Sequence, residues 1–194
     1  MENIVLMKSA RESLKDKWPL AILTFFIYML ITGVPGSIKI GGTIISLLIN
    51  GPFALGAAGF SLSIVRGKEA RTEQIFEGFN RFAVSASACF LIFISVFLWS
   101  LLLIVPGIIA ALSYSMTYYI LNDDPSLSAA TALKKSKVMM EGYKLKLFYL
   151  GLRFFLLALL CILTLGIGFL WLVPYIHITI ALFYEDVKRN FKVN

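Results

Sequence analysis

The chain has 194 residues, of which 59% are hydrophobic and only 15% are charged, and its formal net charge is +7. A soluble domain typically carries about 25% charged residues, so this composition excludes an ordinary soluble fold and indicates an integral membrane protein. Apart from Lys39, the charged residues fall into four clusters. The uncharged runs between them cover residues 18–38, 40–65, 82–122 and 154–184.

The lengths of these runs predict how often the chain crosses a membrane. A hydrocarbon core about 30 Å thick needs roughly 20 helical residues, so the first two runs each cross once. The third run is about twice that length and has Val105-Pro106-Gly107 near its middle, where the chain can reverse. The fourth run has a similar break at residues 164–168. We therefore predict an all-α polytopic fold with six transmembrane helices.

These helices are expected to form a single integral membrane domain over residues 1–194. The predicted spans cover residues 18–37, 42–65, 82–104, 106–122, 146–164 and 168–185. With six crossings, every Lys and Arg except Lys39 lies on one face, and short basic loops are retained on the cytoplasmic side. Both termini are therefore predicted to be cytoplasmic, whereas four crossings would place the basic residues 134–153 outside.

Short amphipathic helices are predicted on the same cytoplasmic face. The first covers residues 3–17 and has an apolar face suited to the membrane interface, formed by Ile4, Met7, Ala10 and Leu14. Residues 75–82 have a similar apolar face. A third helix is expected to start after an Asp124-Pro125 cap and to end at Gly142.

Each pair of predicted crossings thus follows an amphipathic helix, and this order suggests three repeated helical hairpins. Val105-Pro106 recurs as Val173-Pro174, and Val34-Pro35 is a third copy. Because the motif is short, the alternative is that it recurs by accident of composition.

Five stretches in order carry a likeness to a known family: Asn50 to Gly56, Ile75 to Phe79, Trp99 to Met116, Ser136 to Lys144 and Leu163 to Asp186. They resemble the bacterial polytopic membrane family called domain of unknown function 975. The resemblance implies a multi-pass protein of the bacterial cell (plasma) membrane and supplies no activity. The Pro-Gly hairpin followed by a basic helix is more distantly similar to the membrane domain of some glycerophosphodiester phosphodiesterases.

The sequence offers little for catalysis or metal binding. It has one histidine, no metal-ligand spacing and no glycine-rich phosphate loop, and Cys89 and Cys161 lie inside predicted spans. We therefore expect no enzyme activity, no cofactor and no metal site. The acidic pairs Asp123-Asp124 and Glu185-Asp186 either meet to bind a cation or are ordinary helix-terminal charges.

The candidate binding residues lie inside the spans, where polar groups usually face a cavity or another helix. Asn50, Gly51 and Pro52 lie at mid-membrane in the second span, which indicates either a ligand site or a tightly packed, kinked helix. His177 is expected either to bond to a neighbouring helix or to relay protons. A hydroxyl-lined cavity is predicted at Ser113 and Thr117.

Basic residues near the cytoplasmic face are predicted to contact anionic lipid headgroups. The candidates are Lys134, Lys135, Lys137 and Arg153. For Arg153, pairing with an acidic residue is the alternative, the candidates being Asp123, Asp124 and Glu141. Membrane lipids are thus the expected partners, together with a membrane protein or a second copy of the chain. No nucleic-acid partner is expected.

Three functions are compatible with these features. The leading hypothesis is a transport-like or lipid-engaging protein with a mid-membrane cavity. The alternative is a non-catalytic scaffold or accessory subunit of a membrane complex, which predicts a dry bundle with an exposed flank of small residues. The third is a lipid enzyme that works at the membrane interface.

The predicted topology has a direct test. Cysteines introduced at positions 39 and 135 should react with a membrane-impermeant reagent from opposite sides, because six crossings place them on opposite faces. Labelling of both positions from the same side would contradict six crossings.

Overall fold

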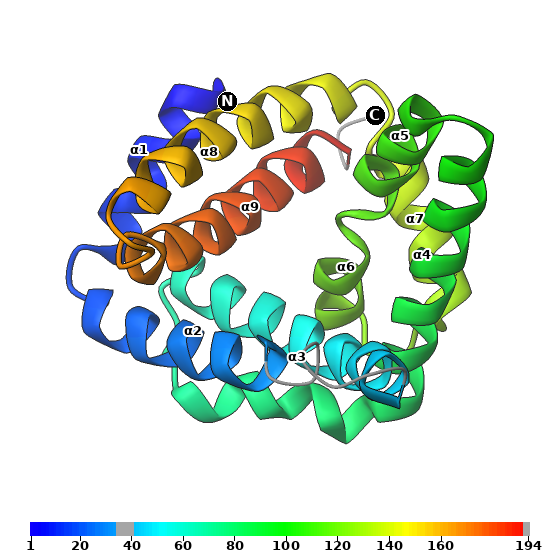
Figure 1. Ribbon diagram of the computed structural model, residues 1–194, viewed down its shortest axis with the longest axis horizontal. Coiled ribbons are helices and arrows are strands. Elements are labelled where there is room, and N and C mark those ends of the chain that lie inside the picture. The colour runs from blue at the N-terminus through cyan, green and yellow to red at the C-terminus, as the bar shows by residue number, and fades with distance from the viewer. Residues whose placement is uncertain (34–40, 192–194) are drawn as a thin grey trace.

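The computed structural model of the protein describes residues 1–33 and 41–191, in which all regular structure is helical, as predicted. Val34-Pro35 and Lys39 lie outside the described residues. The elements, drawn in Figure 1, are α1 (Asn3–Leu14), α2 (Trp18–Gly33), α3 (Gly41–Val65), the 3₁₀ helix η2 (Thr72–Arg81), α4 (Phe82–Leu102), α5 (Ile104–Tyr114), α6 (Thr117–Asp123), α7 (Ala129–Met139), α8 (Lys144–Leu163) and α9 (Phe169–Phe191).

Five helical segments are long and apolar enough to cross a membrane, as expected of a membrane protein. They are α3, η2 with α4, α5 with α6, α8, and α9. The helix α2 is also apolar but has only 16 residues, fewer than the roughly 20 that a crossing needs. The described residues therefore confirm five segments of spanning length, and the sixth crossing stays a prediction.

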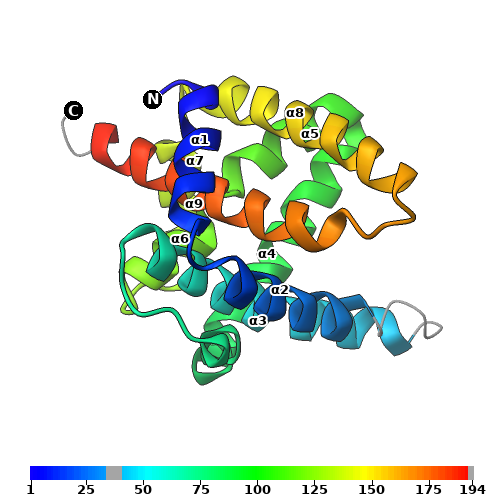
Figure 2. The same cartoon turned by 90° about the vertical axis from the view of Figure 1, so that its left-hand side faces the viewer.

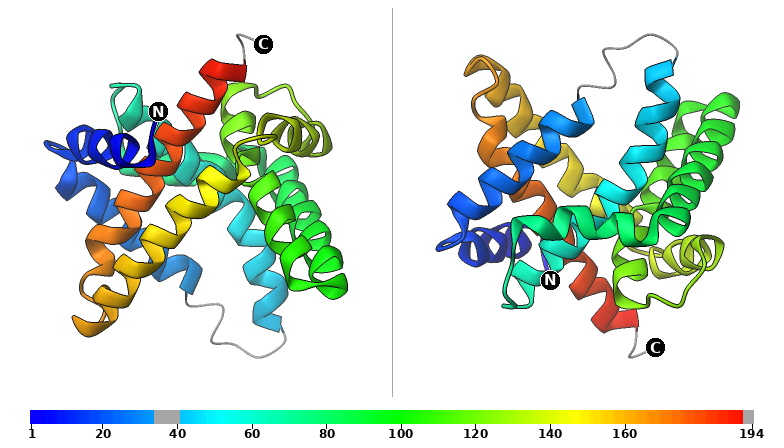
Figure 3. Two further views of the ribbon diagram at one scale, coloured as in Figure 1. Left: turned by 90° about the horizontal axis from the view of Figure 1, so that it is seen from above. Right: turned by 90° about the horizontal axis from the view of Figure 1, so that it is seen from below.

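The long helices run between two ends of the molecule that differ in charge. The start of α1, the helix α7 and the last turns of α9 lie at one end, which we call the charged end (Figure 3). The ion pairs of Asp123 and Asp186 lie there. The helix α1 crosses α9 at this end instead of running alongside it (Figure 2).

Two hairpin turns, between α4 and α5 and between α8 and α9, lie at the opposite end (Figure 3), and neither turn contains a charged residue. The α4–α5 hairpin reverses at Leu103, which has an extended backbone and is exposed. The α8–α9 hairpin reverses at residues 164–168, as predicted. Leu165 is 94% exposed in that turn, and Gly166 has a φ of 87°, which glycine adopts without strain.

The Val-Pro pairs do not mark equivalent places in the two hairpins. Val105-Pro106 lies in the first turn of α5, where proline is well tolerated, so the chain reverses just before it at Leu103. Val173-Pro174 lies inside α9, beyond the turn at residues 164–168. The predicted hairpin repeat is therefore not confirmed.

The helix α3 lies at the centre of the fold and contacts α1, α2, η2, α4, α6 and α9. Its glycines allow the backbones of η2 and α4 to approach closely. A Cβ atom on Gly56 would clash with the carbonyl oxygen of Ile75, and one on Gly78 would clash with that of Pro52. Such contacts are available only to glycine, and they place η2 directly on α3.

The predicted fourth span is divided into α5 and α6 by a break at residues 115–116. Ser136 of α7, which is fully buried, bonds to both sides of this break. Its hydroxyl accepts the N–H of Met116 at 3.2 Å and donates to the carbonyl oxygen of Ser113 at 2.8 Å. One side chain thus satisfies two backbone groups at the place where the helix is interrupted.

The buried face of α1 agrees with the predicted apolar face in part. Ala10 and Leu14 are buried as expected, but Leu6 is buried as well, Met7 is only half-buried and Ile4 is 61% exposed. The physical reason is that α1 packs on α9 and α3, so contact with these helices decides which side is covered.

The helix α7 also begins later than predicted. Ser128 is its N-cap and accepts the N–H of Thr131 at 3.3 Å. Asp124 instead accepts the hydroxyl and the N–H of Ser126, and these hydrogen bonds lower the pKa of Asp124 below its ordinary value. Asp124-Pro125 therefore forms a turn before the helix, because the aspartate bonds locally.

The close contact of α3 with η2 predicts the effect of adding one methyl group. Gly56→Ala should lower the free energy of unfolding by about 1–3 kcal/mol, because the backbone of η2 must move away. The matched control is Gly151→Ala on α8, where nothing lies within 4 Å of the added Cβ. Thermal unfolding in detergent measures both, and equal losses would contradict the close contact.

The bonds of Ser136 make a second prediction. Ser136→Ala leaves two buried backbone groups without their partner and should cost about 1–3 kcal/mol of stability. It should also accelerate hydrogen exchange at the amide of Met116. Ser87→Ala is the control, because Ser87 is exposed and its hydroxyl bonds only within α4. An unchanged exchange rate at Met116 would show that Ser136 does not hold the break.

Candidate functional site

The predicted mid-membrane site lies in a helix that continues through Pro52. Gly51 and Pro52 are buried, and Asn50 is half-buried. A Cβ atom on Gly51 would clash with the carbonyl oxygen of Ser85, so this turn packs closely against α4. The geometry favours helix packing over ligand binding as the role of these three residues.

His177 of α9 lies among aromatic rings. Its imidazole stacks on Phe25 with the ring centroids 4.5 Å apart. The imidazole and the ring of Tyr28 pack in a T-shaped arrangement with their centroids 5.8 Å apart. Tyr28 in turn packs against Phe53 of α3, with the two ring centroids 6.4 Å apart. Aromatic packing thus links His177 to α2 and, through Tyr28, to the segment that follows Asn50.

Ser113 and Thr117 are buried, and their hydroxyls donate to carbonyl oxygens of α5, Ser113 to Ile109 and Thr117 to Tyr114 across the break, both at 2.7 Å. Their hydrogens are therefore used within the chain. Ser113 also lines a surface hollow of about 210 Å³ together with Trp99, Lys137 and Lys144. Thr117 does not line that hollow, so the two predicted residues are not brought together in one cavity there.

Acidic residues of the two predicted pairs do meet at the charged end, but basic side chains of the chain bind them. The Arg66 Nη2 atom lies 2.6 Å from both Asp123 Oδ1 and Glu185 Oε1. Tyr184 donates to Asp123 at 2.6 Å, and Lys188 donates to the same carboxylate. In the part of the chain that the structure describes, no group of three or more His, Cys, Asp or Glu side chains is arranged to hold a metal ion.

This network joins the ends of three helices. Partial burial acts to lower the pKa of Arg66, but its hydrogen bonds to Asp123 and Glu185 outweigh that effect, and the pKa lies above its ordinary value. The charged guanidinium therefore holds α3, α6 and α9 together. Asp186 is bound in a similar way by the amino group of Met1 and by Lys146, each at 2.8 Å.

The candidates for headgroup contact are all exposed. Lys134, Lys135 and Lys137 lie on the outer side of α7, and Arg153 lies on α8. The ion pairs found over residues 1–33 and 41–191 do not join Arg153 to any of the three predicted carboxylates. Arg153 instead faces α1, beside a groove.

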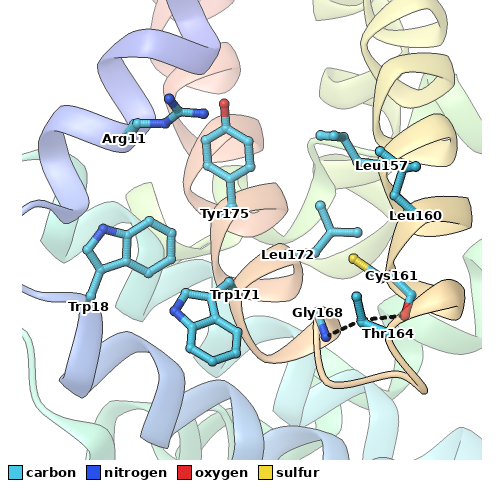
Figure 4. Close-up of a pocket in the computed structure, with 10 residues that line it drawn as sticks. All are labelled: Arg11, Trp18, Leu157, Leu160, Cys161, Thr164, Gly168, Trp171, Leu172 and Tyr175. Atoms are coloured by element: carbon cyan, nitrogen blue, oxygen red, sulfur yellow. Dashed lines mark hydrogen bonds between the residues drawn. The ribbon is translucent and has the colours of Figure 1, made fainter.

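The groove is an open, mainly apolar hollow with a volume of about 360 Å³. It lies between the start of α2 and the helix α8, and α9 lies between them (Figure 4). Arg11 lies beside the hydroxyl of Tyr175 at one end, and Thr164 and Gly168 form the other end (Figure 4). Between these ends the lining consists of Trp18, Leu157, Leu160, Cys161, Trp171 and Leu172.

A second hollow of about 260 Å³ continues from the Arg11 end of the groove. It shares Arg11 and Tyr175 with the groove and is also lined by Lys8 and Arg153. We call Lys8, Arg11 and Arg153 the cationic cluster. Tyr175 donates to the carbonyl oxygen of Met7 at 3.0 Å, which fixes α1 beside α9 at this place. The site therefore combines an apolar groove with three converging cations.

The sequence predicts only one member of this site. Arg153 is a predicted headgroup contact, whereas Lys8 and Arg11 are simply polar positions of the first helix. The lining comes from the first two helices, α1 and α2, and from the last two, α8 and α9, and these two pairs are far apart in the chain. The one usable signal is tryptophan placement, because two of the three Trp residues, Trp18 and Trp171, line the groove.

The fold and the groove define a helical protein with five segments of membrane-spanning length and a lateral apolar site. Residues 101–191, from the end of α4 to the end of α9, match the family described as Protein of unknown function (DUF975). The chain thus resembles this family, as its motifs imply. Comparison with curated proteins and with solved structures gives no match. Because the family supplies no activity, the function must be argued from the groove.

Proposed function

We propose that the protein is a lipid-engaging, non-catalytic integral membrane protein that receives a lipid acyl chain in the groove between α2 and α8. The groove itself carries the proposal, because it is apolar along its length and lies on the flank of a helix of spanning length. Tyr175 and Gly168 are seven residues apart, which corresponds to about 10 Å along a helix. The groove therefore fits part of one chain, about a third of the hydrocarbon core.

The outward faces of the helices support contact with lipid over contact with a protein scaffold. They carry large apolar side chains, among them Phe90, Phe93 and Phe97 of α4 and Phe155 and Leu156 of α8. Tight contact between membrane helices depends on small residues. Gly51, Gly56 and Gly78 already fulfil that role inside the fold. The scaffold alternative, which requires an exposed small-residue flank, therefore has less support.

A transport-like role at mid-membrane also has less support than binding in the groove. The turn of Gly51 packs against α4, and His177 stacks on an aromatic ring of α2. A substrate pathway needs a polar lining that reaches the middle of the membrane. The groove lies on the flank instead and is open to lipid.

In the proposed orientation, the charged end faces the cytoplasm, because basic segments are retained there. Lys134, Lys135 and Lys137 then face the anionic inner leaflet, where each cation contributes about 1 kcal/mol. This orientation in the cell membrane rests on the distribution of basic residues and on the family resemblance.

Tryptophan fluorescence tests whether the groove holds a chain. In a Trp99→Phe protein, the remaining Trp18 and Trp171 both line the groove. Phospholipid with brominated acyl chains, titrated into the protein in neutral detergent, should quench them along a saturable curve. Cys161→Phe should weaken this binding at least fivefold, because the larger ring occupies the groove.

The matched control is Ile162→Phe, one residue along the same helix. Ile162 is 61% exposed and does not line the groove, so this variant should bind lipid as the parent does. Quenching that rises without saturation in the parent, or equal curves for the two phenylalanine variants, would refute the groove as the site.

A further inference from the structure

We infer that the groove selects an anionic phospholipid, whose phosphate binds to the cationic cluster of Lys8, Arg11 and Arg153 while its chain lies along the groove. This inference rests on the proposed function, because it assigns the headgroup of a lipid whose chain the groove holds. It adds a specificity that the apolar lining alone does not provide.

The first support is the convergence of three cations on one hollow. Lys8 and Arg11 lie one turn apart on α1, and Arg153 lines the same hollow from α8. No carboxylate is among the residues that line this hollow. Over residues 1–33 and 41–191, the ion pairs use other cations, namely Arg66, Lys146, Lys188 and the amino group of Met1. A bound anion would relieve the repulsion among the three cations.

The second support is the position of Arg153 along α8. It lies nine residues after Lys144, the first residue of the helix, which corresponds to about 14 Å. A cation is costly at such a depth in a spanning helix unless it reaches the interface or has a partner. Arg153 shares a hollow with Lys8 and Arg11 of α1, so a phosphate bound in this hollow would contact both α1 and α8.

The third support is the order of polar and apolar groups. Arg11 and the hydroxyl of Tyr175 lie at one end of the groove, and Trp171 and Leu172 lie farther along it (Figure 4). A phospholipid has the same order, from its phosphate to its chain. An arginine side chain offers paired N–H groups that match two phosphate oxygens, so the two arginines suit a phosphodiester well.

The test compares two brominated phospholipids that differ only in headgroup, anionic phosphatidylglycerol and zwitterionic phosphatidylcholine. The protein is the full chain with Trp99→Phe in neutral detergent. We expect the parent to bind the anionic lipid at least tenfold more tightly. Arg11→Gln/Arg153→Gln should reduce that preference at least fivefold, because each cation contributes about 1 kcal/mol. The affinity for the zwitterionic lipid should fall less, since its choline ammonium already offsets the charge of its phosphate.

The control variant is Lys137→Gln/Lys144→Gln, which removes the same charge from the separate hollow beside Ser113. It should keep the preference for the anionic lipid. Thermal unfolding of each variant establishes that it is folded, which is expected because Arg11 and Arg153 are exposed. Inorganic phosphate alone, at the same concentration, should not displace the lipid.

The outcomes separate the inference from the proposed function. Saturable but equal binding of both lipids overturns the inference and leaves the groove as a chain site. An equal loss of preference in the two double variants also overturns it, because diffuse surface charge would then explain the selectivity. Displacement by inorganic phosphate would show a site for a free anion instead. The absence of saturable quenching by either lipid would overturn the proposed function itself.

Discussion

The direct contact between the backbones of α3 and η2 is the constraint on which the fold depends. In a membrane, apolar side chains gain little by leaving lipid for protein, so helices associate mainly through close packing and interhelical hydrogen bonds. Gly56 and Gly78 provide the close packing. Asn122 provides a hydrogen bond, donating to the carbonyl oxygen of Leu55 at 2.9 Å and so fixing α6 on the same helix. With α3 held from two sides, α9 and α1 can pack across it.

The long helices could be predicted because the thickness of the bilayer limits them. Uncharged runs of the right length and the glycine-containing break at residues 164–168 were sufficient to place α3, α4, α8 and the start of α9 closely, whereas α9 continues to Phe191, beyond the predicted end at residue 185. The break between α5 and α6 could not be predicted in this way. Neither Ser115 nor Met116 is a helix breaker, and the interruption depends on a hydroxyl of α7 twenty residues beyond Met116.

The roles of the candidate site residues also depend on contacts with distant parts of the chain, which the sequence does not reveal. A glycine followed by proline at mid-membrane is typical both of a ligand site, because proline frees a backbone carbonyl, and of a close helix contact, because glycine lets another backbone approach. Only the backbone of Ser85 opposite Gly51 distinguishes the two. The cationic cluster could not be predicted either, because it too depends on how distant helices pack. The charges of Lys8 and Arg153 are visible in the sequence, but their approach depends on how α1 packs across α9.

The backbone N–H groups of the turn between α8 and α9 do not depend on water for hydrogen bonds. All five of its N–H groups, from Thr164 to Gly168, donate to oxygen atoms within the segment of residues 161–168. Unpaired backbone groups are what normally keep a turn out of hydrocarbon. With those donors satisfied and Leu165 at its tip, this hairpin is able to end inside the lipid. Proteases and antibodies on that side of the membrane would then be unable to reach the turn between α8 and α9.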